Sequence, residues 1–380
     1  MALGPRKVVE LSGRSSVKRY ERIAVPAVVA ATCLAACSSV EFTGPGSQRL
    51  ECGMLDPAFL ADGGVGRDGI PALTDPGFVA QEDTAMFAYL ADFDRVIGIE
   101  VGGEWLAIPH KVMYRHEIVN LNRGSEQIAV TYCPLTGSAL AFDRTPLGGV
   151  EFGVSGLLYQ ANLIMYDRDA DDSLWPQMAG VAECGPRQGQ RLVRRPVVEM
   201  TWGGFRALFP RSMVVGIDAG RTELYSFNPY GISYEFPDNP SYLGFPIPRA
   251  DERRAPKERV LGFPGDDTDP PVAFPFDWMA ARGDRWVVEF EYAGAPAIVL
   301  WDNTLHAAVG ARPVAGGRRL TFEVRDGAIM DTETGSVWSV AGEAVAGSLR
   351  GKRLELISDS YVAFWQAWAA YHPGTELPVG

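Results

Sequence analysis

Short apolar runs, each ended by glycine, proline or a polar pair, recur along most of this chain. Such runs are typical of β-strands joined by tight turns. The clearest case is a hairpin, in which Gly102-Gly103 separates two apolar runs. Strands are expected over residues 95–101, 104–109 and 127–133. Helix is expected where aromatic residues recur at helical spacing, over residues 200–210 and 361–373. The pattern therefore predicts a β-rich α+β fold.

The same pattern occurs twice, at a separation of about 164 residues. The run that begins at Arg95 is matched by the run that begins at Arg259. The Ser-Leu-Trp run that ends at Trp175 is matched by the Ser-Val-Trp run that ends at Trp338. Because several such matches occur in the same order in both parts of the chain, we expect two tandem homologous halves of antiparallel strands, each closed by an aromatic helix. We expect the halves to pack with pseudo-two-fold symmetry.

This repeat divides the chain. The expected segments are a lipoprotein signal peptide (1–36), a tether (37–60), a site-bearing first half (61–210), a connector (211–258) and a degenerate second half (259–378). The halves differ near their centres, because Asp302 stands where the first half has Cys133. The second half also lacks about six residues within Ser155–Ala161. A working site is therefore expected in the first half alone.

The N-terminus resembles an export signal. Residues 1–22 contain six Lys/Arg against two Asp/Glu, and a short apolar run ends in Leu-Ala-Ala-Cys37. This ending resembles a bacterial lipobox, in which Cys37 is lipidated and becomes the mature N-terminus. The alternative is an ordinary signal peptide or an uncleaved anchor. We expect an exported protein anchored to the cell envelope by lipid on Cys37. If the cell has two membranes, Ser38 favours the periplasmic side of the outer membrane.

Composition narrows the class of partner. The chain has 380 residues, of which 47% are hydrophobic, enough for a substantial core. Its formal net charge is −12, and removal of the basic residues 1–36 makes the mature chain more acidic still. This charge argues against nucleic acid as a partner and against electrostatic docking on anionic lipid. The sequence does not identify a cofactor or a protein partner, and a small-molecule ligand is compatible with it.

Three cysteines remain after the signal and the lipidated residue, namely Cys52, Cys133 and Cys184. An odd number leaves at least one thiol unpaired within the chain. Outside the cytoplasm a disulfide is permitted. Our interpretation is a Cys52–Cys184 disulfide with Cys133 free.

Cys133 ends an apolar strand and opens a turn, which allows three interpretations. It can be a buried, inert cysteine. It can be a nucleophilic or redox thiolate, with His116 as its base and catalytic partner and with the turn amides binding an anion. It can also join His116 and Asp167 as a metal ligand, although no CxxC or HxxxH spacing supports a metal site.

The turn and the following glycine-flanked loop are the candidate ligand-binding segments. Their polar or flexible residues are Thr136, Gly137, Ser138, Ser155, Tyr159 and Asn162. The Gly-x-Ser-Gly spacing at Ser155 is one residue short of a nucleophile elbow. We interpret the loop as one whose glycines permit close backbone approach. Asp167 recurs as Asp331, which favours a structural turn or cap role for both.

Six segments carry a resemblance to a known family, over about residues 54–378. They are His116–Asn120, Thr131–Leu135 with Gly137-Ser138, Phe152–Leu158, Asn162–Arg168, Ser173–Trp175 and Phe364–Pro373. At these residues the chain resembles the bacterial DUF3179 domain proteins. The resemblance implies an envelope-associated bacterial protein and supplies no reaction. Many members look like Cys-Pro-Leu-Cys at the central turn, whereas this chain has Thr136 at the second position, which leaves one thiol.

Two hypotheses follow. The first is a lipid-anchored envelope protein with a thiol-centred site at Cys133, either catalytic or redox. The second is a non-catalytic lipoprotein that binds a small ligand or metal, or that serves in assembly. The surroundings of Cys133 and its distance from His116 discriminate between them.

Overall fold

The computed structural model describes residues 38–41, 49–52, 55–83, 86–169, 172–217, 219–248, 250–266 and 269–378. The expected signal peptide and Cys37 lie outside these residues. Two short strands, β1 (Ser38–Glu41) and β2 (Arg49–Cys52), pair with each other in the expected tether. No described helix is both long enough and apolar enough to cross a membrane.

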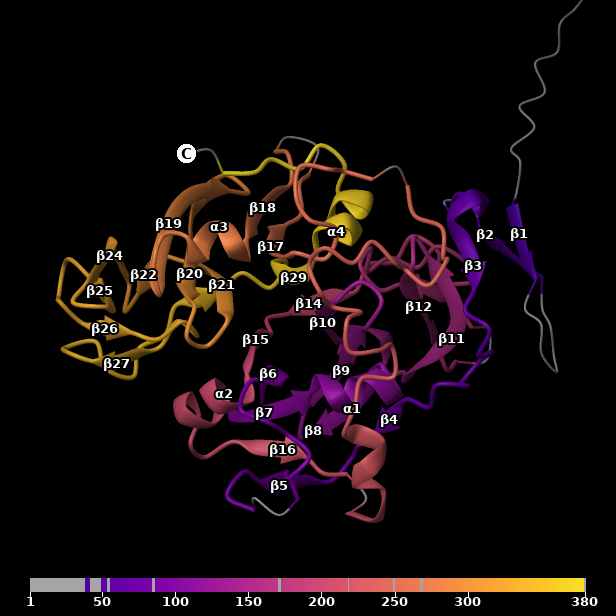
Figure 1. Cartoon of the computed structure of the whole chain (residues 1–380), viewed down its shortest axis with the longest axis horizontal. Coiled ribbons are helices and arrows are strands. Elements are labelled where there is room, and N and C mark those ends of the chain that lie inside the picture. Colours follow the sequence, from indigo (N-terminus) through magenta and orange to yellow (C-terminus); the bar gives the residue numbers. More distant parts are fainter. Residues whose placement is uncertain are drawn as a thin grey trace, which may run out of the picture. The chain divides into compact units, whose positions relative to one another are not determined.

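The predicted hairpin is confirmed. Strands β6 (Arg95–Val101) and β7 (Glu104–Pro109) pair across Gly102 and Gly103, both of which have positive φ as a tight turn requires. They belong to a sheet of order β15-β6-β7-β16-β5 (Figure 1). Its other strands are β15 (Val198–Thr201), β16 (Met213–Val215) and β5 (Phe78–Ala80). Helix α1 (His110–His116) follows β7, and helix α2 (Trp202–Leu208) follows β15.

A second sheet carries the turn with the cysteine. Its order is β14-β10-β9-β8-β4, and β9 (Glu126–Cys133) lies at its centre. Its other strands are β14 (Val193–Arg195), β10 (Ser138–Asp143), β8 (Ile118–Arg123) and β4 (Leu73–Thr74). Because Ser138 pairs with Cys133, the turn between β9 and β10 is short and fixed in register.

A third sheet, of order β13-β12-β11-β3, carries the glycine-flanked loop. Its strands are β13 (Leu174–Pro176), β12 (Asn162–Asp167), β11 (Phe152–Tyr159) and β3 (Leu60–Asp62). The pairing of β11 with β12 shifts register between Val154 and Leu158, which bends the strand there. The described residues also contain short 3-10 helices outside the sheets, namely η1 (Pro57–Phe59), η2 (Thr145–Leu147) and η3 (Ala219–Tyr225).

The C-terminal residues form further sheets with similar orders (Figure 1). One joins β18 (Val272–Pro275), β17 (Arg259–Phe263) and β29 (Tyr361–Phe364). Another joins β19 (Arg285–Tyr292), β20 (Ala295–Asp302), β21 (Ala307–Arg312) and β28 (Glu355–Leu356). A third joins β24 (Phe322–Arg325), β25 (Ala328–Asp331), β26 (Val337–Trp338) and β27 (Ala344–Ala346). Strands β22 (Val314–Ala315) and β23 (Arg318–Arg319) pair with each other, and helices α3 (Phe276–Ala280) and α4 (Trp365–Tyr371) follow β18 and β29.

The two aromatic segments begin as strands rather than as helices. Val198–Thr201 pairs with β6 and Tyr361–Phe364 pairs with β17, and each helix starts only at the tryptophan that follows. All four residues of β29 are buried, so sheet pairing and burial outweigh the helical spacing of the aromatic residues. The β-rich α+β prediction is otherwise confirmed.

Two backbone hydrogen bonds link the N-terminal and C-terminal sheets in a reciprocal way. The amide of Phe364 donates to the carbonyl of Thr136 over 2.9 Å. The amide of Thr201 donates to the carbonyl of Leu305 over the same 2.9 Å. Phe364 ends β29 just before α4, and Thr201 ends β15 just before α2. Each of the two binds a turn in the other set of sheets, namely the turn after β9 for Phe364 and the turn after β20 for Thr201.

Candidate functional site

Cys133 is packed in the protein interior. Its side chain is 1% exposed, and its sulfur receives a long hydrogen bond from the amide of Leu163 over 3.4 Å. Burial, with a smaller contribution from the nearby Glu117 carboxyl, raises the pKa of the thiol to about 11. A thiol with this pKa is almost wholly protonated at neutral pH, whereas nucleophilic cysteines have a depressed pKa.

His116, the predicted partner of Cys133, binds elsewhere. Its Nδ1 lies 2.8 Å from the carbonyl oxygen of Pro71, and its Nε2 lies 2.9 Å from the Tyr225 hydroxyl. Burial lowers the pKa of His116, so the neutral ring is favoured. Both ring nitrogens are therefore occupied by contacts that tie α1 to the segment before β4 and to η3. The structure does not bring the predicted catalytic pair together.

The polar residues of the turn bind one another. Asn162 donates to Thr136 over 2.9 Å and to Gln177 over 2.8 Å, and it accepts from the amide of Met178 over 3.0 Å. Ser138 donates to Gln177 over 2.8 Å. Thr136, Ser138 and Asn162 are wholly buried. A satisfied buried network of this kind fixes the turn and leaves these groups little capacity to bind a ligand.

The other residues predicted to contact a ligand are also held by contacts within the chain. Ser155 donates to the carbonyl of Ile164 over 2.6 Å, and the carbonyl of Tyr159 accepts from Tyr371 over 2.9 Å. Gly137 has φ +61°, and a Cβ there would lie 2.7 Å from Phe364. These residues have structural roles, because their contacts join β11 to β12, β11 to α4, and the turn after β9 to β29.

The three residues proposed as a metal set are also separate. Asp167 accepts from the amide of Ser173 over 3.0 Å and from the Trp175 indole over 2.9 Å. Asp331 accepts from Trp338 in the same way, also over 2.9 Å. Asp167 therefore serves as a turn acceptor, the role expected from its recurrence. Within the residues that the structure describes, no group of three His, Cys, Asp or Glu side chains lies close enough to hold a metal.

Cys184 takes part in a disulfide, and Cys133 is free, as expected. The side chain of Cys52 lies outside the described residues. The Cys52–Cys184 pairing stays a prediction.

An apolar cavity of about 170 Å³ opens beside this buried turn. Its apolar wall is supplied by β11, by the turn after β9, by the start of β12 and by the segment before β4. The lining residues of these segments are Gly63, Val65, Ile70, Leu135, Val154, Gly156, Leu157, Leu158 and Leu163. None of the six residues predicted to bind a ligand is among the described residues that line it. The cavity adjoins the predicted site at Leu135 and Leu163.

Glu117 brings the one carboxyl group among the described residues that line this cavity. It is 6% exposed, and burial raises the pKa of its carboxyl to about 8, while a hydrogen bond from Tyr230 opposes the rise. Its backbone ends α1 in the left-handed conformation, with φ 56°, a position that usually takes glycine. A buried carboxyl with a raised pKa in a cavity wall is a candidate functional group.

The glycines of the loop serve a close approach within the chain. The amide of Gly63 donates to the carbonyl of Gly156 over 2.8 Å, and a Cβ on Gly156 would lie 2.6 Å from Gly66. Gly156 itself has φ +82°. The prediction of close backbone approach is therefore correct, but the approaching group is the segment 63–66, which forms one wall of the cavity.

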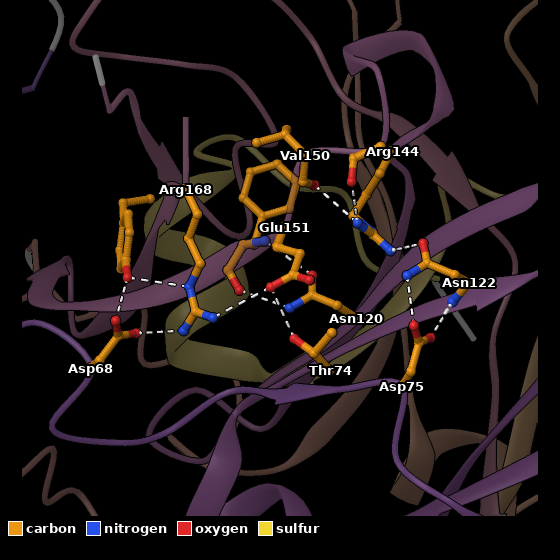
Figure 2. A network of polar contacts seen from close by, with 12 residues as sticks. Asp68, Thr74, Asp75, Asn120, Asn122, Arg144, Val150, Glu151 and Arg168 are labelled. Atoms are coloured by element: carbon orange, nitrogen blue, oxygen red, sulfur yellow. Dashed lines mark hydrogen bonds and ion pairs between the residues drawn. The ribbon is translucent and has the colours of Figure 1, made fainter. Parts of the chain in front are cut away.

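A polar network holds the continuation of this wall, the segment 68–75, against the second and third sheets. Its main pairs are Asp68 with Arg168 over 2.8 Å, Thr74 with Glu151 over 3.0 Å, and Asp75 with Asn122 over 2.8 Å (Figure 2). Arg168 also reaches Glu151, so that one arginine links two carboxylates from different segments. None of these network side chains is among the described residues that line the cavity.

The expected connector, residues 211–258, supplies the rest of the lining. Tyr230, Leu243 and Phe245 line the cavity. Tyr234 anchors this segment, because its hydroxyl donates to the carbonyl of Leu135 over 2.9 Å. The buried Lys257 ammonium donates to the carbonyl of Tyr234 over 2.8 Å. The connector is therefore an integral part of the candidate site.

Two larger depressions, of about 360 and 490 Å³, have charged walls. In the first, Arg195 pairs with Glu126 over 2.6 Å. In the second, Arg194 lies 3.8 Å from Asp359. Both depressions are polar, and neither offers the mainly apolar surface that a small ligand usually requires.

A buried group of ion pairs lies deeper in the protein. Arg259 pairs with Glu235 over 2.6 Å, and His110 Nε2 lies 2.9 Å from Glu199, which Arg95 approaches to 3.9 Å. The cavity beside Glu199 measures about 10 Å³, room for no more than one water molecule. Opposite charges therefore balance one another there without space for a ligand.

The sequence pattern does not predict the residues that define the cavity. Glu117 stands in the His116–Asn120 motif, so its position next to the candidate histidine was the available signal. Tyr230 and Phe245 gave no such signal, because nothing in a proline- and tyrosine-rich connector shows which of its aromatic side chains turn inward.

Comparison with known proteins places the chain in a family without assigning a reaction. No curated protein and no solved structure matches it. A family model described as a protein of unknown function, DUF3179, matches residues 67–375, which is most of the chain. The expected resemblance is thereby confirmed, and the chain belongs to the DUF3179 family.

Proposed function

We propose that this protein binds a small, largely apolar molecule in the cavity beside Glu117. The observation that carries the proposal is a preformed apolar cavity of about 170 Å³ in which Glu117 supplies the one carboxyl group among the described lining residues. Ligand sites are typically apolar with a few placed polar groups. An apolar cavity of roughly 150 Å³ in another protein binds benzene, so this volume suits a single ring with short substituents.

The cavity favours the binding hypothesis over the thiol-centred one. Cys133 is buried and is not among the described residues that line the cavity, and the pKa of its thiol is raised to about 11. His116 has other partners. The predicted catalytic pair therefore lacks both a reactive thiolate and a base, whereas the binding hypothesis needs neither.

We also propose the two tandem halves expected from the repeat. The matching sheet orders, the reciprocal bonds of Thr136 and Leu305, and the recurring aspartate–tryptophan bond support this proposal. Strand β11 has eight residues, whereas its counterpart β24 has four. The extra length carries Gly156, Leu157 and Leu158, which line the cavity. The second half therefore has no equivalent of this wall.

The cellular setting is a proposal of its own. We propose that the chain is exported and held at the cell envelope by lipid on Cys37, because residues 1–37 have the order of a lipoprotein signal. Anchoring would place the cavity close to a membrane surface, where apolar small molecules concentrate.

A titration with fluorobenzene, followed by ¹⁹F NMR, tests the binding proposal. The wild-type protein is expected to bind this probe. Val65→Trp, at a rim residue that is 45% exposed, is expected to fill the mouth and abolish binding. Val345→Trp is the matched control, because Val345 is 44% exposed and lies on β27, so it should leave binding intact. Equal binding by all three proteins would contradict the proposal.

A further inference from the structure

The cavity has an unbalanced composition. Its lining carries the Glu117 carboxyl, yet no lysine, arginine or histidine is among the described residues that line it. The carboxyl receives a hydrogen bond from the Tyr230 hydroxyl. Burial of a carboxylate without a cation is costly, and a ligand can supply the cation that the chain does not.

Two aromatic rings, Tyr230 and Phe245, line the same cavity as this carboxyl. Aromatic faces attract organic cations, and a carboxylate set among aromatic rings is a common way to recognise an ammonium group. The leucines opposite would accept the apolar part of such a molecule. The arrangement therefore offers one charged contact and a surrounding apolar surface.

We propose that the ligand of this cavity is a small apolar amine, whose ammonium group pairs with the Glu117 carboxylate while its apolar body fills the space between β11 and the connector. This inference rests on the proposed binding function and specifies the chemistry of the ligand. A neutral molecule of equal size would leave the carboxylate unpaired or would require it to stay protonated.

The groups that face Glu117 do not compete for this role. Tyr230 comes from the connector and Cys133 from the end of β9, and the pKa of each is raised by burial, so both are neutral. His116, the preceding residue, is bound to Pro71 and Tyr225, and burial lowers its pKa. Arg115 lies on α1 with its guanidinium 4.9 Å from the centre of the Phe227 ring, and is not among the residues that line the cavity.

Competition between benzylamine and benzyl alcohol for the fluorobenzene site tests the inference. The experiment uses the full-length protein and its Glu117→Gln variant at pH 6, 7 and 8. Benzylamine stays protonated over this range, so its binding should strengthen as Glu117 ionises. With the free carboxyl titrating at about 8, affinity for benzylamine should rise about 50-fold from pH 6 to pH 8. Affinity for benzyl alcohol should not rise.

The Glu117→Gln variant keeps the shape of the cavity and removes its charge. It should still bind fluorobenzene, lose the preference for benzylamine and lose the pH dependence. If benzyl alcohol binds the wild-type protein better than benzylamine at every pH, the amine inference is wrong and the cavity remains a binding site. If fluorobenzene does not bind either protein, the proposed function fails, and the inference fails with it.

Discussion

Replacement of Glu117 by glutamine should change how the stability of the protein depends on pH. The carboxyl titrates at about 8 in the folded protein, against a reference value of 4.5. Between these values the folded protein holds a proton that the unfolded chain has released. Wild-type stability should therefore fall as pH rises from 4.5 to 8, by at most about 5 kcal/mol. The fall is complete above pH 8.

Glutamine cannot ionise, so the stability of the variant should not fall with rising pH through this position. Urea unfolding at pH 5 should give nearly equal free energies for the two proteins, because protonated glutamate resembles glutamine. At pH 8 the variant should be more stable by about 3 to 4 kcal/mol. Glu289→Gln, at an exposed position on β19, is the matched control and should show no such pH-dependent difference. A difference between wild type and Glu117→Gln that stays constant from pH 5 to pH 8 would refute the assignment of a buried protonated carboxyl.

Three further predictions concern residues around the cavity and in the second half. Cys133 should resist iodoacetamide in the folded protein at pH 7.5 and react fully in 8 M urea; rapid labelling of the folded protein would contradict a buried thiol with a pKa of about 11. Asn162→Leu should lower the free energy of unfolding by about 2 to 4 kcal/mol, because Thr136 and Gln177 lose a buried partner. A change below about 0.5 kcal/mol in urea unfolding would show that the network does not stabilise the fold. Burial lowers the pKa of His372 to about 3, so the stability of the folded protein should fall as pH drops from 6.5 towards 3. In thermal unfolding at pH 4, His372→Phe should therefore lose less stability than wild type. Equal acid sensitivity of the two proteins would show that His372 does not cause the loss.

Local sequence patterns were reliable where neighbouring residues determine structure. Gly102-Gly103 between two apolar runs predicted β6 and β7 with the boundaries that the structure has. The recurrence of Asp167 as Asp331 predicted a turn role, and both carboxylates accept from an indole. In each case the residues that determine the structure lie within about ten positions of one another, so their interaction is visible in the sequence.

The candidate site was only partly predictable. The stretch around Cys133 was identified, and the cavity indeed adjoins it at Leu135 and Leu163. The hydroxyl and amide groups of that stretch satisfy one another, however, which no spacing reveals because the partner Gln177 comes from a later segment. The actual lining combines pieces from the segment before β4, the end of α1, β11 and the connector.

Burial also reversed the expected chemistry of two residues. Cys133 is a poor nucleophile because the interior disfavours its charged form. The same effect makes Glu117 protonatable near neutral pH, which an acidic residue in a sequence does not suggest. Whether a titratable residue is buried, and beside which groups, is set by tertiary packing, and the sequence alone could not show it.

The most direct test of the cavity as the binding site is to soak a crystal of the protein in bromobenzene and to determine its structure. We expect an anomalous bromine peak within the cavity, between Leu158 and Tyr230, with no comparable peak in the two charged depressions. A peak in the depression beside Arg194 and Asp359, with the cavity by Glu117 empty, would contradict the binding proposal.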